Sequence, residues 1–223
     1  MKEVLAFLKE LSANNNREWF AENKASYEKA KMLFDKSVEE LLLRMSVIDP
    51  SLAGVNLKDC LWRIYRDTRF SPDKTPYKRH FGAFIAKGGK KAGHGGYYIH
   101  VEPDNCFIGG GVWRPDPKLL KKLRQNVYVH IDEFLQIIEN KDFKKVYHSF
   151  DTEEALKTVP REFPKDFSHP ELLKLKHFVV SKEVDEAFFD KKDWLNEVIH
   201  DFEVLKPMND FLNYVVDEYK EDL

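Results

Sequence analysis

The sequence predicts an α+β fold with a central, mainly antiparallel sheet of about four to five strands, packed by long N- and C-terminal helices. Three observations support this prediction. The spacing of apolar residues is helical at both ends of the chain and changes to short alternating runs in the centre. Turn-forming residues separate these central runs. Because no repeat or linker interrupts the 223 residues, we expect one α+β domain over residues 1–223.

The N-terminal region predicts two helices. Apolar residues at helical spacing from Val4 onward indicate a short first helix, which ends at three consecutive asparagines. Asn15 and Glu18 have the spacing of a capping box for the next helix. An apolar stripe then continues from Trp19 to Met45, and Pro50 lies just beyond its end. A stripe of this length predicts one long helix lying on a larger surface, most simply the sheet.

The central region predicts a meander of short strands. The runs are aromatic or β-branched and lie at residues 61–67, 80–86, 97–102 and 105–113. The turn residues Pro103 and Asp104 predict a hairpin between the last two of these strands. Consecutive strands joined in this way favour antiparallel pairing.

Helices return in the C-terminal half. Asp116 followed by Pro117 is typical of a helix start, with the aspartate as cap and proline in the first turn. We expect helices after this point and a short one at 143–150, with a loop from 160 to 170, an edge strand at 177–181 and a closing helix at 194–219. Pro207 predicts a kink in the closing helix.

The composition indicates a cytoplasmic protein. Hydrophobic residues make up 43% of the chain and charged residues 33%, and no apolar run approaches the roughly 20 residues that cross a bilayer. The N-terminus lacks the continuous apolar region of a secretory signal. Cys60 and Cys106 lie in apolar surroundings without CxxC spacing, so we expect two buried thiols rather than a disulfide.

The net charge of −2 hides an uneven distribution. Residues 58–91 contain ten basic and three acidic side chains, a local charge of +7, whereas residues 183–223 carry −9. The basic segment favours an anionic ligand, while the acidic tail argues against broad affinity for nucleic acid. The alternative is that the two segments neutralise each other within the fold.

The basic segment offers both strand and loop positions for a ligand. Alternation along 61–67 leaves at least one of Arg63 and Arg66 half-buried, where it needs a carboxylate, a carbonyl or a ligand. Asp67 or Asp73 could supply that carboxylate and make the arginines purely structural. Residues 71–78, reading SPDKTPYK, form a stiff basic loop that is the best phosphate-binding candidate. The alternative is a surface loop with solvated lysines.

Two further features are candidate parts of a site. Tyr98 and His100 point to the same side of a predicted strand, and His100 could act as a general acid or base. A core histidine with a satisfied nitrogen is the favoured alternative. The glycines 109–111, Gly110 among them, allow close approach of a ligand or of backbone, and we favour backbone packing. His80, His94 and His100 lack the spacing of a ligand set, so neither a metal nor a cofactor is expected.

The same residues resemble a conserved bacterial family catalogued as domain of unknown function 2461. The resemblance is carried by NNNREWF, RIYRDTRFSPDKTPYK, YYIHVEP and GGGVWRP, and it weakens after Pro170. It implies a single α+β domain of cytosolic type and implies no known activity, substrate or cofactor. The positions that match the family pattern are Arg63, Arg66, Asp67, Arg69, Lys74, Tyr77, Lys78, Tyr98, His100, Gly110 and Trp113.

Two functional hypotheses follow. In the first, these positions form a basic pocket for an anionic small molecule bearing phosphate or carboxylate; His100 is the candidate proton-transfer group, and the others contact the ligand. In the second, the chain is a non-enzymatic interaction module whose residues 58–91 bind an acidic protein or a nucleic acid. No membrane partner is expected, and no motif identifies a reaction. A third interpretation is that the charges only hold the fold together.

Overall fold

The computed structural model describes residues 1–221 and confirms the α+β fold, with a four-stranded antiparallel sheet at its centre. The strands follow one another in chain order across the sheet, as β1 (Phe81–Ala86), β2 (Gly96–Val101), β3 (Cys106–Val112) and β4 (Phe178–Val184). The hairpin predicted at Pro103 and Asp104 joins β2 to β3. The expected edge strand is β4, which is longer than the prediction and pairs with β3.

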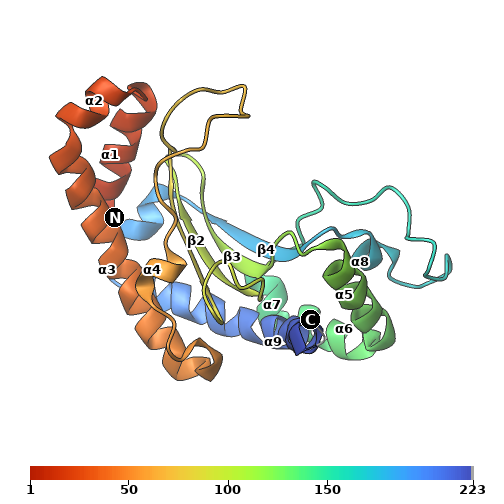
Figure 1. Cartoon of the computed structure of the whole chain (residues 1–223). Coiled ribbons are helices and arrows are strands. Elements are labelled where there is room, and N and C mark those ends of the chain that lie inside the picture. The colour runs from red at the N-terminus through yellow and green to blue at the C-terminus, as the bar shows by residue number, and fades with distance from the viewer. Residues whose placement is uncertain (222–223) are drawn as a thin grey trace.

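Helices surround this sheet on one face and at both ends (Figure 1). The α-helices are α1 (Lys2–Ala13), α2 (Arg17–Glu22), α3 (Lys24–Ile48), α4 (Leu57–Cys60), α5 (Pro117–Val129), α6 (Ile131–Ile138), α7 (Lys141–Val146), α8 (Pro170–Lys174) and α9 (Trp194–Glu221). Two short 3₁₀ helices, η1 (Pro50–Leu52) and η2 (Glu186–Asp190), connect longer elements. Figure 1 shows α1 to α3 at one end of the sheet, α5 and α6 at the other, and α9 running beneath it.

Strand alternation gives the sheet one fully buried face. Ile85 in β1, Ile99 in β2 and Ile108 in β3 are at most 1% exposed, and they share this face with other apolar side chains. Helix α9 packs against β2 and β3, and α3 packs against β1 and α9. The opposite face carries the intervening side chains, among them Phe84 and Tyr98, which are partly exposed. A candidate site on the sheet must therefore use this second face.

The long helix predicted after the first one is divided at Asn23, which ends α2 and begins α3. The predicted capping box is also wrong, because Asn16 rather than Asn15 accepts the backbone N–H of Trp19. Asn15 has a different role. Its side-chain amide donates to the Tyr77 carbonyl at 3.0 Å and accepts from the Tyr77 N–H at 3.1 Å. This pair of bonds ties the corner between α1 and α2 to the chain that leads into β1.

The strand predicted at 61–67 does not form. Within the described chain this segment makes only isolated bridges, from Leu61 to Ala83 and from Tyr65 to Tyr77. The Lys78 N–H donates to the Ile64 carbonyl, so the segment pairs first with β1 and then with the chain just before it. Because the partner changes after a few residues, neither pairing continues long enough to be a strand.

Several other local predictions are confirmed. Asp116 caps α5 by accepting the N–H groups of Lys118 and Leu119, with Pro117 in the first turn. The predicted closing helix is α9, and Pro207 lies within it. Both cysteines are buried free thiols. Among residues 1–221, no helix has the length and apolar character needed to cross a membrane.

Candidate functional site

Arg66 and Arg69, which were expected to bind an anion beside the loop 71–78, are each matched to a nearby aspartate. Arg66 forms an ion pair with Asp73 and also donates to the Thr75 side chain. Arg69 binds Asp67 through two side-chain hydrogen bonds of 2.9 and 2.6 Å. These pairs correspond to the structural alternative set out above, because each guanidinium already has a carboxylate. Neither arginine lies with Tyr98 and His100, as the pocket hypothesis had required.

The next two predicted ligand residues are also occupied by the protein. The Lys74 ammonium donates to the Thr68 carbonyl at 2.9 Å. Tyr77 is 6% exposed, and its ring stacks on Phe20 with the centroids 3.9 Å apart. Lys74 therefore closes its own loop, and Tyr77 belongs to the core that joins α2 to the sheet.

Gly110 and Trp113 lie away from the partly exposed face of β1 and β2. A Cβ at Gly110 would come within 1.9 Å of the Gly96 carbonyl oxygen, so the glycine allows two backbones to approach, as the favoured interpretation stated. Trp113 is 52% exposed and stands against His177, with 4.4 Å between ring centroids. Neither position contributes to a common site with His100.

Two hollows of the surface also lie elsewhere. One is bounded by α1, α2 and α3, and includes Phe7 and Trp19. Another lies beside α7 and α9, and includes Lys182 and Asp201. No residue of the basic segment lines either of these two hollows. The candidate site is therefore sought on the partly exposed sheet face.

On that face, β2 and the residue after it hold a hydrogen-bonded chain of three side chains. The Tyr98 hydroxyl lies 2.9 Å from Nδ1 of His100, and Nε2 of His100 lies 3.1 Å from Oε2 of Glu102. The three residues alternate along one extended segment, so their side chains share a face. Asn105, in the hairpin, donates to the same Glu102 oxygen at 3.0 Å. The Phe107 ring stacks on His100 at 4.5 Å and fixes the imidazole plane.

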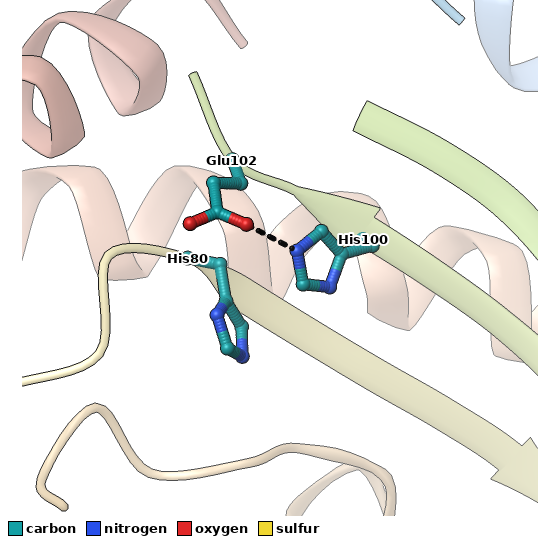
Figure 2. Close-up of side chains that lie close together, drawn as sticks. All are labelled: His80, His100 and Glu102. Carbon is teal, nitrogen blue, oxygen red and sulfur yellow. Dashed lines mark hydrogen bonds and ion pairs between the residues drawn. The ribbon is translucent and has the colours of Figure 1, made fainter. Parts of the chain in front are cut away.

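His80, the residue just before β1, completes the cluster. Its ring centroid lies 4.3 Å from that of His100, and Figure 2 shows both imidazoles beside the Glu102 carboxylate. One donor atom each from His80, His100 and Glu102 lies within 4.8 Å of the other two. Among residues 1–221, no side chain or backbone group is hydrogen-bonded to His80. We refer to these three residues as the His–His–Glu cluster.

Burial and neighbouring charge keep the imidazoles neutral. Burial and, to a smaller extent, the nearby His100 lower the pKa of His80 to about 4, against the opposing effect of Glu102. Burial also lowers the pKa of His100, although the hydrogen bond with Glu102 opposes this. For Glu102, burial acts to raise the pKa, but the bonds from His100 and Asn105 outweigh it and the pKa is lowered. At neutral pH the cluster therefore presents two neutral imidazoles and one carboxylate.

The sequence placed Tyr98 and His100 on one strand face, whereas His80 was set aside as a metal ligand because of its spacing and Glu102 was not considered as a site residue. The signal lay in the pairing register, because Phe81 is opposite Val101 and the next pair outward is His80 with Glu102. His100 and Glu102 are two residues apart and share a face. Spacing along the chain alone could not show the cluster, since the loop between β1 and β2 sets which residues face each other.

A second feature, the Trp62 patch, lies beside this cluster. We use this name for Trp62, Arg63, Lys78 and Lys90. The ammonium groups of Lys78 and Lys90 lie 5.5 and 5.6 Å from the centre of the Trp62 ring, which is 41% exposed. Burial lowers the pKa of Lys78, and the positive charge of Arg63 lowers it further. Lys78 in turn contributes to the lowered pKa of His80, so the patch and the cluster share one region.

The fold and this region define an α+β protein with a histidine–carboxylate cluster on the partly exposed face of an antiparallel sheet. The family model described as "Conserved hypothetical protein (DUF2461)" matches residues 3–211, and the chain belongs to this family. The resemblance seen in the sequence is thereby confirmed. No curated protein matches the chain. No solved structure matches it either.

Proposed function

We propose that this protein binds a small anionic molecule, bearing phosphate or carboxylate, at the Trp62 patch. The observation that carries the proposal is that two cations of this patch have no carboxylate partner among the described residues. Within residues 1–221, neither Arg63 nor Lys78 forms an ion pair with a carboxylate, whereas Arg66 and Arg69 both do. Unpaired cations that crowd one another are stabilised by an anion, which binds through charge-assisted hydrogen bonds.

The lowered pKa of Lys78 supports the same proposal. The Lys78 ammonium is partly buried and lies near Arg63, so desolvation and charge repulsion both disfavour its charged form. A bound anion relieves both effects, and so binding energy is gained without first breaking an internal ion pair. Trp62 adds an exposed flat ring on which an unsaturated ligand can stack.

Of the residues expected on sequence grounds, the proposal keeps Arg63 and Lys78 as ligand contacts. It sets aside Arg66, Arg69 and Lys74, whose side chains already have partners in the protein. His100 and Tyr98 then lie at the border of the site. The two buried thiols support a reducing compartment, and we place the protein in the cytoplasm.

A thermal-shift screen of phosphorylated and carboxylated metabolites tests this function, with the melting temperature followed against ligand concentration. A ligand of the folded state raises the melting temperature by mass action. Arg63→Gln and Lys78→Gln should each weaken binding by about tenfold or more, as expected for loss of a charge-assisted bond. Arg69→Gln is the matched control, because it removes a cation from the same segment that already has its own acid.

The result that contradicts this proposal is binding that Arg69→Gln weakens while Arg63→Gln and Lys78→Gln leave it intact. The absence of any stabilising anion from the screen would also count against it.

The interaction-module alternative is favoured by one specific observation, the exposed aromatic tip of the loop between α4 and β1. Phe70 is 94% exposed, and the Arg69 guanidinium lies 5.9 Å from its ring centre. In Figure 1 this loop projects beyond the end of the sheet. A nucleic acid bound there would dissociate steeply with salt, with a linear log–log dependence, and Phe70→Ala would weaken it.

A further inference from the structure

We propose that His80, His100 and Glu102 form a binding site for a divalent first-row transition metal ion. Two imidazoles and one carboxylate are a donor set that zinc and ferrous iron use in proteins, and they leave coordination positions open for water or a ligand. The inference is independent of the anion-binding proposal, since it depends on different side chains.

The first support is the spacing of the donor atoms. Two ligands bound about 2.1 Å from one ion lie roughly 3.0 to 3.4 Å apart when the angle between them is octahedral or tetrahedral. The 3.1 Å between Nε2 of His100 and Oε2 of Glu102 falls in this interval. One donor atom of His80 lies within 4.8 Å of both, so a modest turn of this side chain brings it to the same centre.

The second support is the chemical state of the donors. A metal binds imidazole through an unprotonated nitrogen, so a neutral histidine gives up no proton on binding. Burial keeps His80 and His100 neutral, and Glu102 is ionised. Since no group within residues 1–221 is hydrogen-bonded to His80, metal binding breaks no bond of that side chain. The carboxylate supplies negative charge that two neutral ligands lack.

The third support is the outer layer of contacts that orients the donors. Tyr98 holds Nδ1 of His100, which directs Nε2 toward Glu102. Asn105 donates to the same Glu102 oxygen and helps to fix the carboxylate. Hydrogen bonds of this kind on the far side of metal ligands fix the tautomer and the ring orientation. With a metal on Nε2, the proton of His100 moves to Nδ1 and is donated to the Tyr98 oxygen.

The chain also contains a built-in comparison. His94 is 5% exposed, and its Nε2 lies 2.9 Å from Asp217, which resembles the contact between His100 and Glu102. Its other nitrogen faces Lys220, a cation, at 3.1 Å. Among residues 1–221, the His–His–Glu cluster alone brings three possible ligand residues together. His94 is therefore a matched control for a buried histidine–carboxylate pair.

The test is isothermal titration of the full-length, chelator-treated protein with Zn²⁺, followed by visible absorption after loading with Co²⁺. We expect one tightly bound ion per chain and a rise in melting temperature when the ion is present. His80→Gln should abolish tight binding and the cobalt spectrum, and His94→Gln should preserve both. Tyr98→Phe should weaken affinity about tenfold to a hundredfold, as expected when an outer contact of a ligand is lost.

Circular dichroism of each variant establishes whether it is folded. His80 is partly exposed, and no group of residues 1–221 is hydrogen-bonded to its side chain, so His80→Gln tests the site even if a change at the more buried His100 disrupts the sheet. The proposal is overturned if the wild-type protein binds neither ion, or if His80→Gln binds Zn²⁺ as tightly as the wild type. Loss of binding in His94→Gln with retention in His80→Gln would place the ion elsewhere.

Discussion

In the metal-free protein, His80 should make folding less favourable as the pH falls below 6.5. Its pKa is about 4 in the folded protein, because burial disfavours the charged imidazole, and 6.5 is the ordinary value for the unfolded chain. The groups that act on it are His100, Glu102, Lys78 and Arg79. Between these two pKa values the unfolded chain binds a proton that the folded chain does not, so acid favours unfolding.

The size of this effect follows from the difference in pKa. If His80 were fully shielded from solvent, the free energy of unfolding would fall by about 1.4 kcal/mol per pH unit in this interval, or by about 2 kcal/mol from pH 6.5 to pH 5. Because His80 is partly exposed, we expect about 1 to 2 kcal/mol between pH 7 and pH 5. Above pH 6.5 the imidazole is neutral in both states, and its contribution becomes constant.

Urea denaturation in the presence of a chelator measures the effect. The free energy of unfolding is compared at pH 7 and pH 5 for the wild type and for His80→Gln, which cannot titrate. The variant should lose less stability than the wild type over this interval, by the amount given above. His148→Gln, at an exposed histidine, should behave as the wild type does. If the wild type and His80→Gln lose equal stability, His80 is not shielded as the structure indicates.

Two further predictions concern the core that supports the site. Tyr97→Phe should cost about 2 kcal/mol, because the buried hydroxyl donates to the Asp49 carboxylate at 2.8 Å; chemical denaturation measures it, and the exposed Tyr214→Phe should be nearly neutral. Gly110→Ala should cost about 3 kcal/mol or more, because the added methyl group would meet the Gly96 carbonyl; a melting temperature close to that of the wild type would contradict this packing.

The fold was largely predictable because its signals are local. Alternation along β2 and the turn at Asp104 depend on neighbouring residues, and so does the cap at Asp116. Predictions failed where distant contacts decide the structure. Asn15 lies in a sequence typical of a helix cap, yet its side-chain amide is hydrogen-bonded to the backbone of Tyr77, far along the chain. Segment 61–67 has strand composition, but the chain around it offers only brief pairing.

The candidate site was less predictable for the same reason. The loop arginines suggested a convergent anion site, whereas Arg66 and Arg69 are satisfied by aspartates within a few residues of them. A sequence cannot show whether an adjacent acid points toward an arginine or away from it. His80 and Glu102 become neighbours only through the register of β1 with β2, which depends on how the loop between these strands closes.

The double hydrogen bond between Asn15 and Tyr77 has a consequence for engineering this protein. Lys78 follows Tyr77 directly, and His80 comes two residues later, so the amide of Asn15 anchors the backbone that presents both side chains. Shortening the N-terminus as far as α2 would remove this anchor together with the buried apolar side chains of α1, among them Phe7, which stacks on Phe81 of β1. A tag or fusion partner is therefore better attached to the C-terminus, because the N-terminal helices help to build the surface on which ligands are expected.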